Sequence, residues 1–286
     1  MTSRYRRLKN QALLGCMALA VVLVLVPLIS LLVTLFDHGA RVINWHFLTG
    51  AWAPVGEQGG IAHAIAGSVA LLLLASLIAV PIGLVQGVYL SQFGSTRLAR
   101  WTRILLDVMT GIPAIIVGVF VYTVMVPKHG FSLGVGYSML AGGLALAMVM
   151  LPIFARAAEE ALRAIPRHVN EAGLALGLPR RVVIRRILLR AALPSLLTAL
   201  FLALARIGGE AAPLLFTAFG SNEWPNSLVR PVGSLPQLLF DYARQPFQEL
   251  VDQAWGAALV LVVLILTIRL ATNLYLRWYF RPGGDI

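Results

Sequence analysis

Charged residues and cysteines are scarce in this chain of 286 residues, and each scarcity excludes a class of protein. Only 12% of the residues are Asp, Glu, Lys or Arg, about half the roughly 25% of an average soluble domain. The single cysteine, Cys16, excludes an internal disulfide and a metal cluster built on cysteines. Lysine occurs only at Lys9 and Lys128, and neither follows a glycine, so the phosphate-cradling loop G-x-x-x-x-G-K-[ST] is missing. ATP hydrolysis by that route is therefore excluded.

Motifs for other catalytic chemistry are also missing. The zinc motif H-E-x-x-H does not occur, and the five histidines are scattered along the chain. We therefore expect no catalytic residue, no metal site and no bound cofactor, and the chain is not expected to be an enzyme.

Long apolar runs are what the sequence has in abundance. Hydrophobic residues make up 59% of the chain, and the mean hydropathy is +0.83. A membrane-spanning helix needs about 20 mostly apolar residues. This criterion predicts an all-α polytopic membrane protein, with residues 1–286 forming one transmembrane domain of six spans. The expected spans are roughly 12–36, 62–91, 103–126, 136–156, 188–219 and 254–276.

Basic residues are distributed unevenly between the two sides of these spans. Seventeen of the 23 lysines and arginines flank the spans on one side, and four lie on the other. Basic residues are enriched in cytoplasmic loops. We therefore expect a multi-pass protein of the cell inner (plasma) membrane with both termini in the cytoplasm. On the external side, apolar periodicity over Leu235 to Tyr242 predicts a short surface helix where a partner could rest.

The expected cytoplasmic loop 157–187 is rich in arginine and amphipathic. Pro166 suits the start of a helix, Gly177 suits its end, and Pro179 suits the start of a second helix that enters the next span. This pattern indicates a docking surface made of two short helices. The alternative is an ordinary positively charged loop.

Two ionisable pairs lie within or near the expected spans. Arg206 and Glu210 are four residues apart, so they share one helix face. An arginine in a span is costly unless it faces a cavity or a partner, and a guanidinium suits an oxyanion. We expect this pair on the substrate path; the alternative is a self-neutralising pair that only aids packing. Arg103 and Asp107 have the same spacing, and there we favour a structural pair.

Within the cytoplasmic loop, the sequence resembles the signature E-A-A-x3-G-x9-I-x-L-P of type I ABC importer permeases. The matching residues are Glu171, Ala172, Gly173, Gly177, Ile187 and Leu189. Gly173 stands where the family has its second alanine, and Arg190 stands where proline is usual.

The resemblance implies the type I ABC importer permease fold with cytoplasmic coupling helices. It also implies that the loop docks on a dimer of ATPase subunits, which would bind and use ATP and Mg. Four further stretches resemble one of the two membrane subunits of the phosphate-specific importer. They are residues 59–94, 111–120, 206–218 and 234–246. In that subunit, Gln92 is usually glutamate and Ala211 is usually threonine, which weakens any direct ligand role for position 211.

By this resemblance, the chain is the permease subunit that carries inorganic phosphate across the inner membrane. Its partners would be a sister permease, the ATPase dimer and an extracytoplasmic phosphate-binding protein, and nucleic acid would not be one. The alternatives are a permease for another oxyanion, sulfate or molybdate, and a stand-alone channel or secondary transporter.

Overall fold

The computed structural model describes residues 3–57, 59–128 and 132–279, so the ends of the expected domain lie outside the described residues. Within those ranges, helices are the regular elements, beside one isolated β-bridge between Phe219 and Val232. The all-α prediction is confirmed. The helices are α1 (Ser3–Val42), α2 (Trp45–Thr49), α3 (Ala62–Gln92), α4 (Arg97–Gly111), α5 (Ala114–Met125), α6 (Met139–Arg163), α7 (Arg167–Ala175), α8 (Arg180–Val182), η1 (Val183–Leu188), α9 (Leu189–Ile207), α10 (Ala212–Thr217), α11 (Leu235–Tyr242) and α12 (Gln248–Tyr279).

Five helices of the described chain are long and apolar enough to cross a membrane. They are α1, α3, α6, α12 and the helix of 28 residues formed by α8, η1 and α9 without a break. The pair α4 and α5 makes a sixth crossing if both helices are counted as one bent span. The protein is therefore a polytopic helical membrane protein, as its composition predicts.

The prediction of one continuous span at 103–126 is wrong, because two helices with a sharp bend between them occupy this segment. Helices α4 and α5 meet at an angle of 104°. Pro113 has no backbone N–H and disfavours helical backbone in the residue before it. Ile112 accordingly has an extended conformation, with φ −75° and ψ 127°. The chain turns sharply at this point and divides the expected span into two helices.

The boundaries of two other helices differ from those of the expected spans. The expected span 188–219 ends at Ile207, because the chain turns at Gly208 and Gly209 before α10 begins. Helix α6 starts at Met139 instead of position 136, and it continues to Arg163, inside the expected loop. No helix-breaking residue occurs between position 156 and Pro166. Within this last stretch, Glu159 and Arg163 form an ion pair with each other.

Helices α3 and α6 pack closely and form the centre of the bundle. Small residues allow this approach, as is usual between membrane helices. A Cβ atom on Gly83 would lie 2.8 Å from the Phe154 ring, and one on Gly87 would lie 2.7 Å from the Ala158 Cβ. The same core includes Ile207 near the end of α9.

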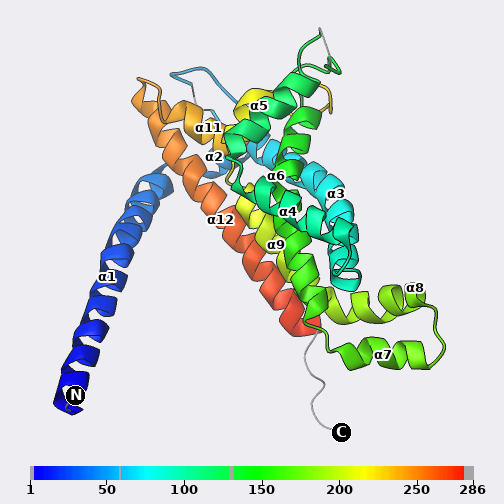
Figure 1. The fold of residues 1–286 in the computed structure, drawn as a ribbon. Coiled ribbons are helices and arrows are strands. Elements are labelled where there is room, and N and C mark those ends of the chain that lie inside the picture. Colours follow the sequence, from blue (N-terminus) through cyan, green and yellow to red (C-terminus); the bar gives the residue numbers. More distant parts are fainter. Residues whose placement is uncertain (1–2, 58, 129–131, 280–286) are drawn as a thin grey trace.

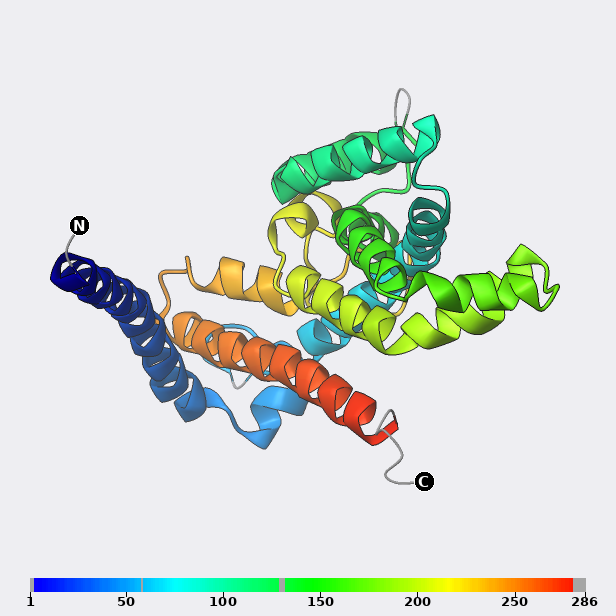
Figure 2. The same ribbon diagram turned by 60° about the horizontal axis from the view of Figure 1, so that its bottom comes forward.

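Helix α1 stands away from the bundle and contacts α12 along part of its length (Figure 1). Gly39 lies against Leu259, and the His38 and Trp255 rings are 5.2 Å apart. Helix α1 begins, and α12 ends, at the end of the molecule where α7 and α8 project (Figure 1). Figure 2 shows the same projection extending sideways from the bundle. The start of α1 and the end of α12 therefore lie on the side that carries the arginine-rich segment.

Candidate functional site

The projecting arm, residues 164–188, contains the helix–turn–helix that the sequence predicts. Helix α7 follows Pro166, which occupies its N-cap position. It ends before Gly177, whose φ of +75° is left-handed and suits glycine. Pro179 is then the N-cap of α8. The helix start, the turn and the restart all follow from the local sequence.

The signature residues divide between the outside and the inside of the arm. Glu171, Ala172 and Gly177 are exposed on it. Gly173 is buried, and a Cβ atom there would lie 3.0 Å from Val183 and 3.1 Å from Ile187. The glycine therefore lets α7 lie close against η1.

The inner side chains attach the arm to the bundle. Ile187 and Leu189 are half-buried and pack in one cluster with Leu162 on α6. The Arg180 guanidinium donates to the carbonyl oxygen of Gln92 at 3.0 Å and lies 4.4 Å from the centre of the Phe93 ring. The arm is thus held to the ends of both α3 and α6. Its exposed residues are free to meet another protein.

Arg206 and Glu210 form the ion pair that their spacing predicts. Glu210, however, does not lie on the same helix, because α9 ends at Ile207. Its backbone N–H donates to the Ile207 carbonyl oxygen at 3.1 Å, which closes a turn through Gly208 and Gly209. This turn brings the carboxylate back to the guanidinium.

The surroundings of this pair are open on one side. The Arg206 side chain is 57% exposed, whereas that of Glu210 is 15% exposed. This chain's own helices therefore leave the guanidinium uncovered. An exposed arginine within a bundle of apolar helices must face water or a partner, because lipid would not solvate its charge.

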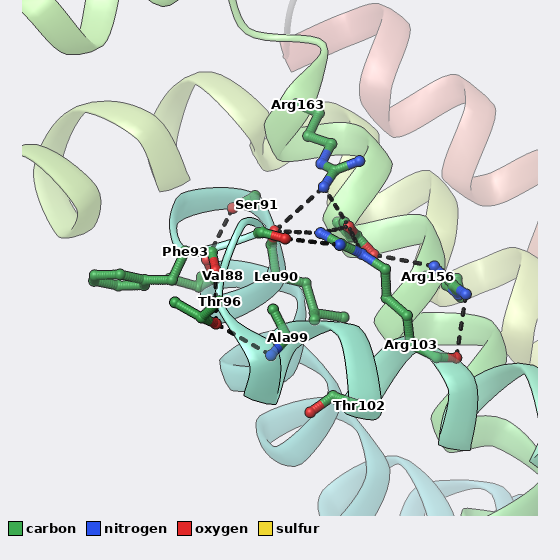
Figure 3. Close-up of polar contacts among 12 residues, drawn as sticks. Val88, Leu90, Ser91, Phe93, Thr96, Ala99, Thr102, Arg103, Arg156 and Arg163 are labelled. Carbon is green, nitrogen blue, oxygen red and sulfur yellow. Dashed lines mark hydrogen bonds and ion pairs between the residues drawn. The ribbon is translucent and has the colours of Figure 1, made fainter.

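A second group of charges, which sequence reasoning missed, lies where α3, α4 and α6 meet near the arm (Figure 3). Its centre is Glu159, whose side chain is only 3% exposed. Three guanidiniums contact this carboxylate: Arg103 and Arg163 at 2.9 Å each, and Arg156 at 3.4 Å. We call Glu159 with these three arginines the Glu159 cluster.

The expected pair of Arg103 with Asp107 is wrong. Arg103 on α4 contacts Glu159 on α6, and Asp107 on α4 contacts Arg156 on α6. The packing of α4 against α6 brings these groups together. A signal was present in the spacing: Arg156, Glu159 and Arg163 follow one another by three and four residues and so share a helix face.

Metal-binding geometry is not found in the part of the chain that the structure describes: no three or more His, Cys, Asp or Glu side chains converge there. The arrangement of charges instead suits two tasks. An exposed arm suits docking, and an exposed guanidinium suits an anion.

Comparison with protein families matches residues 79–281 to the family described as "Binding-protein-dependent transport system inner membrane component". The chain is also similar to curated proteins over nearly its full length. It is 38% identical to the phosphate transport system permease protein PstA of Xylella fastidiosa, over 94% of this chain and 92% of that one. It is 35% identical to the probable PstA of Methanocaldococcus jannaschii, over 92% of each chain.

Solved structures of bacterial ABC transporters share the fold. A chain of the transporter involved in the import of the acidic polysaccharide alginate aligns with a TM-score of 0.72 at 17% identity, over 98% of this chain and 100% of that one. A chain of the inward-facing MetNI methionine ABC transporter aligns with a TM-score of 0.59 at 22% identity, over 78% and 95%. The expected ABC importer permease fold is confirmed.

Proposed function

The chain belongs to the binding-protein-dependent transport system inner membrane components and, within them, to the PstA permeases, and from this membership we propose that it carries inorganic phosphate across the inner membrane. It does so as the membrane permease subunit of an ABC importer. The identity of 34–38% to curated phosphate permeases from bacteria and an archaeon supports phosphate over sulfate or molybdate.

The observation that carries the coupling part of this proposal is the geometry of the arm. Glu171 and Ala172 are presented on a short helix that projects from the bundle, and Gly177 closes its end. A rigid projecting helix can enter a cleft of another subunit and transmit its movement. We assign the coupling loop to the six signature residues, with an ATPase dimer as the partner. Glu171, Ala172 and Gly177 face that partner, and the other three hold the arm in shape and to the bundle.

Energy for transport comes from that partner. This chain has no phosphate-cradling loop with a lysine, so ATP and Mg are bound by the ATPase subunits. The permease itself binds no cofactor and hydrolyses nothing. Its contribution is to change conformation when the ATPase dimer closes on the arm.

The substrate path is assigned to Arg206 and Glu210. The guanidinium is uncovered by this chain's helices, and a sister permease would complete the lining around it. Phosphate has several acceptor oxygens that a planar guanidinium can engage in pairs. The carboxylate of Glu210 orients the guanidinium and weakens its field, which lets the anion leave again.

An extracytoplasmic phosphate-binding protein delivers the substrate at the end opposite the arm. The orientation follows from the basic residues, with both termini and the arm in the cytoplasm. Labelling of single cysteines on a Cys16→Ser background tests it. Cysteines at Lys128 and Arg230 should react with an impermeant reagent from outside, and one at Arg180 only from inside. The reverse pattern would overturn the orientation.

Uptake into vesicles tests the function itself. Vesicles should contain this chain with its sister permease and ATPase dimer, and phosphate should be supplied with the binding protein. We expect phosphate accumulation that requires ATP, with no comparable accumulation of sulfate or molybdate. Accumulation of one of those anions instead would identify a different oxyanion permease, and uptake without ATP or the ATPase would identify a channel or secondary transporter.

A further inference from the structure

The arm is joined to the rest of the bundle in two different ways. It continues directly into α9 through one unbroken helix, so a movement of the arm reaches Arg206 through the backbone. Helices α4 and α5 have no such continuity with the arm. They precede α6 in the chain, and any movement must reach them through side-chain contacts.

The Glu159 cluster supplies the contacts that join α4 to the base of the arm. Glu159 and Arg163 lie in the last two turns of α6, where Leu162 belongs to the same hydrophobic cluster as Val183 and Leu188 of η1. From α4, Arg103 reaches across to the Glu159 carboxylate, with Nε 2.9 Å from Oε1.

Arg103 also binds the C-terminal end of α3. Its Nη1 donates to the Gly94 carbonyl oxygen at 2.9 Å, and its Nη2 donates to the Leu90 carbonyl oxygen at 3.0 Å. The absence of a side chain at Gly94 makes room for this guanidinium, because a Cβ atom there would lie 2.6 Å from Arg103 Nη2. One side chain therefore binds α3, α4 and α6 together (Figure 3).

Helix α5 carries this connection onward to the proposed substrate path. A Cβ atom on Gly118 would lie 2.6 Å from the Pro213 Cα, so α5 and α10 are in direct backbone contact. Pro213 comes three residues after Glu210. A series of contacts therefore runs from the arm through Glu159, Arg103, α4 and α5. It ends beside the Arg206–Glu210 pair, which also lies at the end of α9.

The geometry points to Arg103 and Glu159 as positioning residues that couple the docking arm to the bent pair α4–α5, so that both sides of the Arg206–Glu210 site move together when the arm is displaced. This inference rests on the proposed docking function of the arm. Its test measures movement of the helices as well as transport activity.

The variant that tests the contact between α4 and α6 most directly is Arg103→Gln. It removes the contact that α4 makes with Glu159, while Arg156 and Arg163 still neutralise the Glu159 carboxylate. The matched control is Arg100→Gln on the same helix, because Arg100 is exposed and its side chain has no hydrogen bond or ion pair in the described structure. Both variants lose one positive charge from α4.

The first readout is the amount of phosphate taken up for each ATP hydrolysed by the assembled complex. Arg103→Gln should lower this ratio by about two- to thirtyfold, the range expected when a mutation alters coupling between sites. Arg100→Gln should leave it unchanged. Arg103→Lys keeps the charge but cannot serve the carboxylate and both carbonyl groups together, so its ratio should be intermediate. Should Arg103→Gln fail to assemble, a lysine variant equal to the control would overturn the inference.

The second readout is the distance between spin labels at Val119 on α5 and Val263 on α12, both exposed, on a Cys16→Ser background. In the unaltered complex, ATP should change this distance; in Arg103→Gln, ATPase activity should persist while the distance stays fixed. A wild-type complex with neither an ATP-dependent distance change nor uptake would count against the proposed function. An ATP-dependent change of equal size in Arg103→Gln and wild type would overturn only the link through Arg103.

Discussion

Two arginine–glutamate sites in this molecule contain the same charged groups in opposite surroundings. At the Arg206–Glu210 pair, one guanidinium meets one carboxylate, and the guanidinium is 57% exposed. In the Glu159 cluster, a carboxylate that is 3% exposed meets three guanidiniums from two helices. The first site connects residues that are four apart in the chain, and the second connects Arg103 on α4 with Glu159 on α6, which are 56 residues apart.

Because of this difference, Arg206 is free to exchange its carboxylate partner for another anion, whereas the Glu159 cluster holds helices together. An exposed guanidinium can turn from its carboxylate to an incoming anion at little cost, because water replaces the lost contact. A buried carboxylate among three guanidiniums has no such replacement. We therefore expect changes at Arg206–Glu210 to alter transport, and changes at Glu159 to alter stability first.

The largest effect is expected on stability, when each of the two glutamates is replaced by glutamine in a separate variant. Glu159→Gln leaves three arginines around an uncharged amide, and breaking a buried ion pair costs about 3 to 5 kcal/mol. Glu210→Gln leaves an exposed arginine beside an amide, and an exposed pair contributes about 0 to 1 kcal/mol. The free energy of unfolding of the two variants in mixed micelles measures this difference. Equal losses would mean that burial does not distinguish the two sites.

The next effect concerns transport at the exposed pair. Arg206→Gln should reduce phosphate uptake by about ten- to a hundredfold, because hydrogen bonds to a charged group contribute about 1.5 to 3 kcal/mol. Arg206→Lys should have a smaller effect, since an ammonium keeps the charge and loses the paired donors. Uptake is measured at matched amounts of assembled complex.

Arg244→Gln is the control for that series. Arg244 is also exposed and also pairs with a carboxylate near it in the chain, Asp241. Its variant should transport as well as wild type. Full activity of Arg206→Gln, or an equal loss in Arg244→Gln, would contradict the assignment of Arg206 to the path.

The smallest effect separates two glycines, one at the turn of the arm and one beside the Arg206–Glu210 pair. Gly177 at the turn of the arm has φ +75°, and Gly209 beside Glu210 is not left-handed, while both have open space for a Cβ atom. Gly177→Ala should therefore lower stability by about 1 to 2 kcal/mol through backbone strain, and Gly209→Ala should not. Thermal unfolding of the two variants provides the comparison. The bulkier Gly177→Trp should also uncouple uptake from ATP hydrolysis, whereas unchanged coupling would count against docking of the arm.

Local patterns were enough to predict much of the fold. Apolar runs located the helices, and periodicity placed a helix at Leu235–Tyr242, where α11 lies. That helix is only partly a surface helix, because Leu235 and Leu238 are buried against other helices. In the arm, Pro166 and Gly177 marked the helix ends because capping depends on a few adjacent residues.

The bends and the cluster were harder to predict, for two physical reasons. Pro113 and the pair Gly208–Gly209 are visible in the sequence, but proline and glycine are common in membrane helices, and only packing decides whether a helix bends or breaks there. The contact between Arg103 and Glu159 depends on how α4 crosses α6, which no local pattern specifies. The pair at Arg206 was predictable because its partner lies one turn away.

The most direct test of the contrast between the sites is phosphate uptake by the double variant Arg206→Gln with Glu210→Gln, compared with each single variant at matched amounts of assembled complex. If Arg206 lies on the anion path, uptake by the double variant should stay as low as that of Arg206→Gln, because removing the carboxylate does not restore the donors. If the two residues only neutralise each other, removing both charges together restores a neutral site. Near-normal uptake by the double variant would contradict the account and leave the pair as a packing device.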